Sequence, residues 1–122
     1  MPLLTIAFGI LSVAVLLGAV LATMHLRATE GGALPLWTLG LAHGVVGALG
    51  FAVLAWALAG ETRVVGAFGW DGLALLGAAL LAGTAVPLLA RLRRAGVGAA
   101  MALHASVAII GYVILMAYVS VR

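Results

Sequence analysis

Residues 3–26 read LLTIAFGILSVAVLLGAVLATMHL and contain no Asp, Glu, Lys or Arg. An uninterrupted apolar stretch of about 18 residues or more is typical of a helix that crosses a bilayer. Three further stretches of this kind follow, so the sequence predicts membrane-spanning helices over residues 3–26, 37–58, 72–89 and 97–119. The basic segment of a cleaved signal peptide is absent before the first stretch, so we expect that stretch to be a retained helix.

The composition supports the same class of protein. Of the 122 residues, 66% are hydrophobic and 7% are charged, whereas a soluble domain usually carries about 25% charged residues. These charges are too few to keep a packed globule in water, so we expect an integral membrane protein with one transmembrane domain over residues 1–122. Short loops favour antiparallel neighbours, which makes an all-α four-helix bundle of up-down-up-down order the simplest architecture. Strands are excluded, because four of them cannot close a membrane barrel.

Two absent residue types exclude several kinds of chemistry. The chain has no cysteine, which removes disulfides, thiolate metal sites, iron–sulfur clusters and c-type haem attachment. All six basic residues are arginine, so no Schiff base with retinal or pyridoxal can form. The carboxylates Glu30, Glu61 and Asp71 fall in predicted loops. Their position argues against proton-coupled export of the kind that relies on a carboxylate inside a helix.

The arginines predict how the bundle lies in the membrane. Four of them lie in or beside the first and third loops, which share one side: Arg27, Arg91, Arg93 and Arg94. By the positive-inside rule that side is cytoplasmic, and both termini lie on the non-cytoplasmic side. We expect the membrane to be a bacterial inner membrane, and we do not expect nucleic acid as a partner. Aromatic residues at the predicted helix ends fit an interfacial belt: Trp37, Trp56, Trp70 and Tyr118.

Three histidines lie within the apolar stretches, where an ionisable side chain is costly and is a functional hypothesis by default. His25 ends the first stretch, whereas His43 and His104 lie early in the second and fourth. At about 1.5 Å per residue, the two deeper histidines are roughly 9–10 Å below their helix starts, on the arginine-rich side. In a simple bundle these helices are diagonal, so the two imidazoles can face each other. The alternative is that each imidazole only hydrogen-bonds a backbone carbonyl or a hydroxyl.

The two deeper histidines have matching surroundings at an offset of 61 residues. A small residue follows each at the fourth position, a glycine at the seventh, an aromatic at the eighth and a leucine at the eleventh: Gly47 and Ala108, Gly50 and Gly111, Phe51 and Tyr112, Leu54 and Leu115. The fourth, seventh and eleventh positions share the face of the histidine. Such a stripe either packs helices closely or leaves room for a flat cofactor.

The second interpretation gives one haem b with His43 and His104 as its axial metal ligands, since neutral imidazole is a standard iron ligand. The macrocycle would lie between the second and fourth helices, against the small residues Gly47, Gly50, Ala108 and Gly111. The propionates would need cations on the cytoplasmic side, where the third loop offers Arg91 and Arg94 and the first Arg27. His25 would contact a propionate or a quinone head group, or simply lie at the interface.

This pattern resembles the four-helix membrane b-type cytochromes, the cytochrome b561-like group, in topology rather than in sequence. In that group, histidines at similar depth on helices i and i+2 ligate one haem, as His43 and His104 would here. Members that carry electrons across the membrane have a second histidine pair near the other face. The first and third helices here lack such a pair, so one haem is the limit. Electron transfer across the membrane by this chain alone is not expected.

Two functions of different classes remain. The first is a b-type cytochrome that exchanges electrons with a quinone or a partner membrane subunit. The second is a non-catalytic anchor or assembly subunit, or a small transporter, in which glycine-rich faces associate with partner subunits or with copies of the chain. The lipid bilayer is a partner in either case. A site of three histidines for zinc or copper is a further interpretation.

Overall fold

The computed structural model describes residues 2–32, 37–60, 66–92 and 96–121. The described residues form four helices, which are α1 (Pro2–Thr29), α2 (Trp37–Ala59), α3 (Gly66–Arg91) and α4 (Val97–Ser120). Each is long and apolar enough, by length and composition, to cross a membrane. The prediction of an all-helical protein with four candidate spans is confirmed, and it supports an integral membrane protein.

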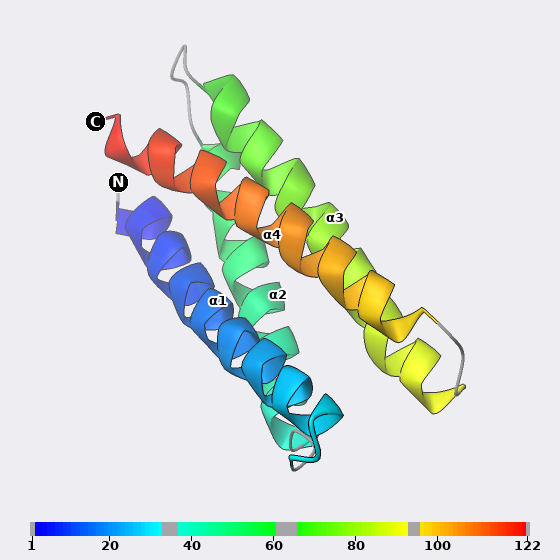
Figure 1. The fold of residues 1–122 in the computed structure, drawn as a ribbon. Helices are drawn as coiled ribbons and strands as arrows, with labels where there is room; N and C mark the ends of the chain where they lie inside the picture. The colour runs from blue at the N-terminus through cyan, green and yellow to red at the C-terminus, as the bar shows by residue number, and fades with distance from the viewer. Residues whose placement is uncertain (1, 33–36, 61–65, 93–95, 122) are drawn as a thin grey trace.

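The helices are arranged as two hairpins. The closest packing is between α1 and α2 and between α3 and α4, while α2 with α3 and α1 with α4 make fewer contacts. The described residues of α2 and α4 make no close backbone contact, so these helices lie on a diagonal. Figure 1 shows both termini at one end of the bundle, called the termini end below. The opposite end, where α1 and α3 finish beside Arg27 and Arg91, is called the arginine end.

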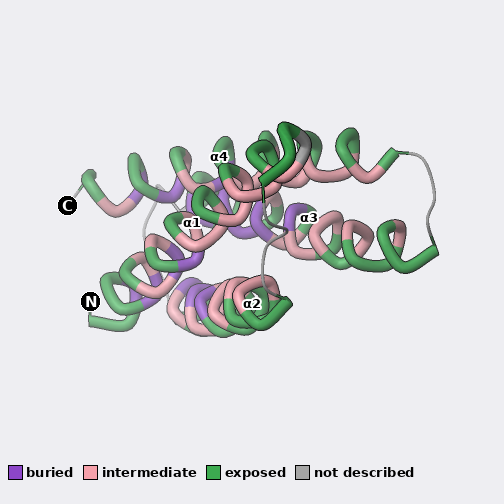
Figure 2. Tube along the Cα trace, turned by 60° about the horizontal axis from the view of Figure 1, so that its bottom comes forward, coloured by how far each residue is buried: buried purple, intermediate pink, exposed green. Residues whose placement is uncertain are grey.

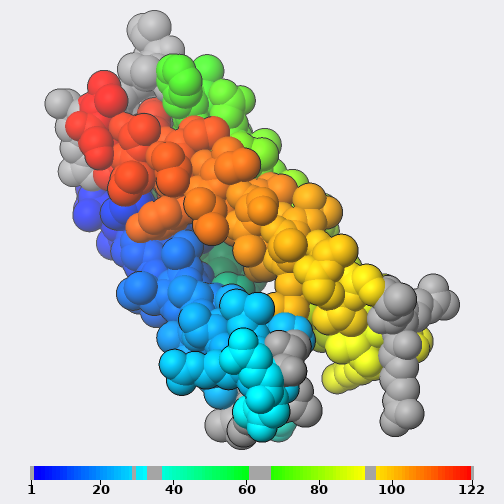
Figure 3. Space-filling view, viewed as in Figure 1, coloured from blue at the N-terminus to red at the C-terminus, as the bar shows by residue number. Residues whose placement is uncertain are grey.

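The buried core lies in the half of the bundle next to the termini end. It is made of residues from all four helices: Leu4, Ala7, Leu11, Leu54, Leu58, Leu73, Leu76, Leu115 and Tyr118. No described residue of α1 after Ala14, of α2 before Gly50, of α3 after Ala79 or of α4 before Gly111 is buried. Figure 2 shows the buried segments on the sides of the helices that face one another. Figure 3 shows the surface hollowed between α1 and α4 toward the arginine end, where the two hairpins separate.

The two hairpins repeat each other in sequence and in packing. Gly50 of α2 packs against Leu11, and Gly111 of α4 packs against Leu76. The sequence shows the match between α2 and α4, and the structure adds one between α1 and α3 at an offset of 65 residues. Its members are Leu11, Ala14 and Gly18 in α1 and Leu76, Ala79 and Gly83 in α3. The bundle is therefore built from two equivalent helix pairs.

Helix α3 begins earlier than the sequence predicts. It starts at Gly66 rather than near residue 72, so Asp71 is helical rather than part of a loop. Glycine and aspartate are typical of a turn, but here Gly69 and Gly72 are buried. A Cβ at Gly69 would lie 2.7 Å from a methyl carbon of Leu58, so no larger residue fits without a shift. In membrane helices glycine allows backbones to approach closely, and this use was mistaken for turn chemistry.

Two other residues differ from expectation, while the tryptophans do not. Helix α3 does not stop at Pro87 but continues to Arg91. Tyr118 belongs to the core rather than to an interfacial belt, because it is only 3% exposed and its ring occupies the space left by the missing side chain of Gly69. The exposed aromatic residues at or near the helix ends are Trp37, Trp56 and Trp70.

The turn after α1 follows the predicted glycine chemistry. Gly31 has a φ of 92°, in the left-handed region that glycine adopts at low cost. The backbone nitrogen of Gly31 donates to the carbonyl of Ala28, and that of Gly32 donates to the carbonyl of Arg27. This is the Schellman pattern that satisfies the last carbonyls of a helix. Pro35, the other residue expected to shape this loop, lies outside the described residues.

Gly111→Ala is expected to destabilise the fold by about 1–3 kcal/mol, the usual cost of overpacking. A Cβ there would lie 3.0 Å from Cβ of Leu75 and 3.1 Å from the backbone nitrogen of Leu76, and a backbone yields less easily than a flexible side chain. The measurement is the midpoint of SDS-induced unfolding followed by circular dichroism. Gly44→Ala is the matched control, because nothing lies within 4 Å of its added Cβ. Equal midpoints for the two variants would contradict the close packing of α3 on α4.

Candidate functional site

His43 and His104 meet between the two hairpins. Their ring centroids lie 5.9 Å apart and their planes are at 90°. His43 comes from α2 and His104 from α4, and both side chains are half-buried. The pair lies at the arginine side of the buried core, where the hairpins begin to separate. The two histidines predicted to lie at matched depth are therefore brought together.

Each imidazole is held by a backbone carbonyl of the other helix in its own hairpin. Nδ1 of His43 lies 2.9 Å from the carbonyl oxygen of Ala14, and Nδ1 of His104 lies 2.7 Å from that of Ala79. A carbonyl oxygen only accepts, so each Nδ1 carries a proton and donates it. In the neutral imidazole this leaves the lone pair on Nε2. Metal-ligating histidines usually have this arrangement, with the second nitrogen oriented by a carbonyl or carboxylate.

Gly18 and Gly83 make room for the two rings. They follow Ala14 and Ala79 by four residues, which puts them on the same helical face one turn later. A Cβ at Gly18 would lie 2.9 Å from Cε1 of His43, and a Cβ at Gly83 would lie 2.9 Å from Cε1 of His104. The sequence analysis missed both glycines because it compared only the helices that carry the deeper histidines. The Ala-x-x-x-Gly spacing that recurs in the first and third stretches is the signal that could have found them.

The small residues that follow the histidines lie mainly within the hairpins. A Cβ at Gly50 would meet a leucine of α1 at 2.8 Å, and a Cβ at Gly111 would meet one of α3 at 3.0 Å. Gly47 is in ordinary contact with Ala14, and Ala108 is half-buried. The glycines therefore let α2 approach α1 and α4 approach α3, which is the packing role weighed for this stripe.

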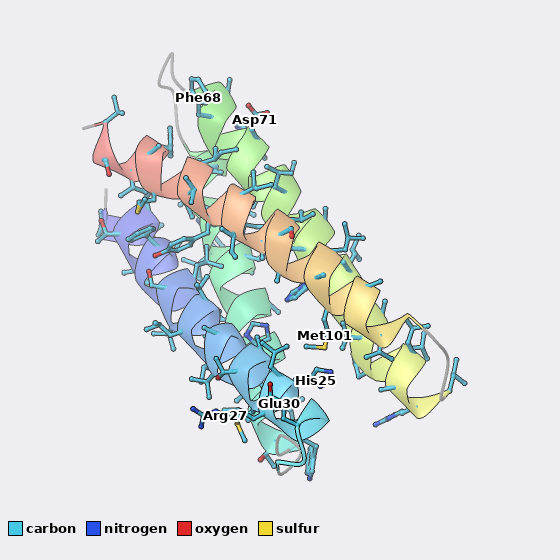
Figure 4. The ribbon with its side chains drawn as sticks, in the orientation of Figure 1. His25, Arg27, Glu30, Phe68, Asp71 and Met101 are labelled. Carbon is cyan, nitrogen blue, oxygen red and sulfur yellow. The ribbon has the colours of Figure 1, made fainter. Side chains whose placement is uncertain are left out.

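The other candidate residues lie at the arginine end. His25 is half-buried, whereas Arg27 and Arg91 are exposed. Figure 4 shows His25 on the side of α1 that faces α4, and Arg27 on the opposite side. Arg94 lies outside the described residues. Among the residues that are described, no three of His, Cys, Asp and Glu are grouped as a metal site, so the structure does not form the three-histidine site there.

The spacing of the pair is compatible with two imidazoles that share one metal ion. Metal–imidazole bonds of about 2 Å, with each ring centre about 1 Å behind its nitrogen, separate the ring centres of two axial ligands by about 6 Å. The observed separation is 5.9 Å, and the ring planes are free to differ by rotation about the metal–nitrogen bonds. No family model, curated protein or solved structure matches the chain. The functional interpretation therefore depends on the geometry of this site.

Proposed function

We propose that the chain is a membrane b-type cytochrome that binds one haem b between its hairpins, with His43 and His104 as axial ligands. The observation that carries the proposal is the pair itself, with ring centroids 5.9 Å apart and both Nδ1 atoms bonded to carbonyls. Those hydrogen bonds lie within each hairpin, so they would be satisfied without the two rings meeting. The alternative of merely hydrogen-bonded histidines leaves the meeting unexplained.

The residues around the pair would bind and orient the haem. The carbonyls of Ala14 and Ala79 fix the imidazole tautomer and increase the basicity of the ligating nitrogen. The separation of the hairpins toward the arginine end supports a site that opens there, with the propionates near Arg91 and His25. A bound haem iron would carry one electron at a time between its ferrous and ferric states. Electrons would pass to or from a quinone in the bilayer or a partner subunit.

The arginines support an orientation for this site. Arg27 and Arg91 are the basic residues in the last turns of α1 and α3. The positive-inside rule favours a cytoplasmic arginine end, an up-down-up-down crossing and non-cytoplasmic termini. The haem would then lie in the cytoplasmic half of a bacterial inner membrane. The likeness to the cytochrome b561-like group supports the same arrangement, with the difference that this chain would hold a single haem.

The test is a reduced-minus-oxidised absorption spectrum of the protein purified in detergent from cells supplied with a haem precursor. We expect the sharp α-band of a low-spin b-type haem with two imidazole ligands, and one haem per chain by pyridine haemochromogen assay. A folded protein that stays colourless would overturn the haem proposal. It would favour a membrane anchor or assembly subunit, in which the two imidazoles only bond Ala14 and Ala79.

A further inference from the structure

A polar contact joins the two hairpins close to the histidine pair. The hydroxyl oxygen of Tyr112 on α4 lies 2.7 Å from Oγ of Ser12 on α1. The Tyr112 ring stacks on Phe8 of α1, with ring centroids 5.3 Å apart and planes at 11°. Oγ of Ser12 donates its proton to the carbonyl oxygen of Phe8 at 2.8 Å. Because a serine hydroxyl has one proton, the Tyr112 hydroxyl is the donor in the bond to Ser12.

This bond connects the two segments that position the histidines. Ser12 precedes Ala14 by two residues, and the carbonyl of Ala14 holds the imidazole of His43. Tyr112 follows His104 by eight residues on the same helix, which is about 12 Å along the axis. The carbonyl bonds fix each imidazole on its own hairpin, but they do not fix the separation of the hairpins. A contact between hairpins beside both histidines can do so.

The equivalent place in the other half of the bundle has no such bond. Phe51 corresponds to Tyr112, and Gly77 corresponds to Ser12. A Cβ at Gly77 would lie 3.1 Å from Cε2 of Phe51, so this ring also crosses to the other hairpin. The two halves therefore share the aromatic contact and differ in the hydrogen bond. This difference offers a control that the chain itself supplies.

We propose that Tyr112 and Ser12 form a clamp, called the Tyr112–Ser12 clamp, that sets the separation of the hairpins and thereby that of His43 and His104. Hydrogen bonds between helices stabilise their association in the bilayer core, where little water competes for the donor. Tyr112 is in this sense a positioning residue, because it acts on the imidazoles through the helices that carry them. The clamp holds the empty protein as well as a loaded one, so the proposal goes beyond haem binding.

The first experiment measures the hairpin separation in protein without haem. Thr23 on α1 and Thr84 on α3 are exposed and bond carbonyls of their own helices, and the chain has no cysteine to interfere. The double variant Thr23→Cys/Thr84→Cys therefore carries one spin label on each hairpin, toward the arginine end. With Tyr112→Phe added, we expect the distance distribution from pulsed EPR to broaden and to shift by on the order of 2 Å, the scale of helix shifts at packed interfaces. An unchanged distribution overturns the clamp.

The second experiment moves the clamp to the other half of the bundle. Phe51→Tyr together with Gly77→Ser places the same two side chains at the equivalent positions. In the Tyr112→Phe background this pair is expected to restore the narrow distribution, whereas Phe51→Tyr alone is not. The unfolding midpoint of each variant, measured in parallel, identifies any that fails to fold. If the transplanted pair folds but does not restore the distribution, the effect of Tyr112→Phe is local packing and the clamp is overturned.

A third experiment links the clamp to the proposed haem site and rests on that proposal. In the loaded protein, Tyr112→Phe is expected to speed haem loss to an apo-myoglobin acceptor, and the transplanted pair is expected to slow it again. Equal rates of loss in all variants would overturn the link between the clamp and the ligands. The EPR experiments use protein without haem, so a failure of the clamp and a failure of haem binding are distinguishable.

Discussion

Alanine in place of His43 or of His104 is expected to abolish haem binding, with loss of the b-type absorption band in either variant. Each hairpin supplies one imidazole, and no described group of three ligand residues offers a replacement. His25→Ala is expected to keep most of the haem, because His25 lies toward the arginine end rather than at the pair. The measurement is haem per chain from the pyridine haemochromogen spectrum, at equal protein concentration.

The control for this series is the fold of the variants. The carbonyls of Ala14 and Ala79 remain within helices when the imidazole is removed, so the bundle is expected to survive either substitution. Circular dichroism and the unfolding midpoint check this directly. Equal haem loss from all three histidine variants, with the fold kept, would contradict the assignment of His43 and His104 as the two ligands.

The class of protein could be predicted because it depends on long apolar stretches, which survive any detail of packing. The start of α3 could not, since Gly66, Gly69 and Asp71 are typical of a turn in a soluble protein. In the structure Gly69 is buried against Leu58 and Tyr118, so its lack of a side chain serves close packing. Whether a glycine in a membrane protein turns the chain or packs a helix depends on the neighbour it faces, and the sequence does not name that neighbour.

The meeting of His43 and His104 could be predicted from depth and direction, but the groups that hold them could not. The acceptors are backbone carbonyls, which have no residue signature. Gly18 and Gly83 are two among 17 glycines, and the repeat that would single them out has a different offset from that of the histidines. There are 25 residues from Gly18 to His43 and 21 from Gly83 to His104. A comparison at one fixed offset therefore finds one helix of each hairpin and misses the other.

The equivalence of the hairpins also explains how two polar side chains are accommodated in an apolar bundle. An unpaired imidazole in hydrocarbon is costly, and each hairpin removes part of that cost by itself with a carbonyl bond. Bringing two such hairpins together then places two Nε2 atoms at one level without any further polar residue. The Tyr112–Ser12 clamp breaks the equivalence at a single contact, beside the pair rather than in it.

Gly18→Ala and Gly83→Ala are each expected to weaken haem binding by about 10–100-fold, the usual effect of disturbing the partners that orient a metal ligand. The added methyl carbon at Gly18 would lie 2.9 Å from Cε1 of His43, closer than real side chains approach, and the same distance applies between Gly83 and His104. The ring must move, and moving it lengthens the bond from Nδ1 to the carbonyl and turns Nε2 away from the shared ion. The measurement is a titration of haem into the apoprotein.

Gly9→Ala is the matched control for this pair, because it adds the same methyl group to α1 where nothing lies within 4 Å. All three substitutions increase helix propensity by a similar amount, so a difference between them reports the contact with the imidazole. Because the hairpins are equivalent, Gly18→Ala and Gly83→Ala are expected to weaken binding to a similar degree while the unfolding midpoint stays close to that of Gly9→Ala. Haem affinities equal to that of Gly9→Ala would mean that the rings are not held against α1 and α3 when the cofactor binds, and the carbonyl bonds would then lose their role in orienting the ligands.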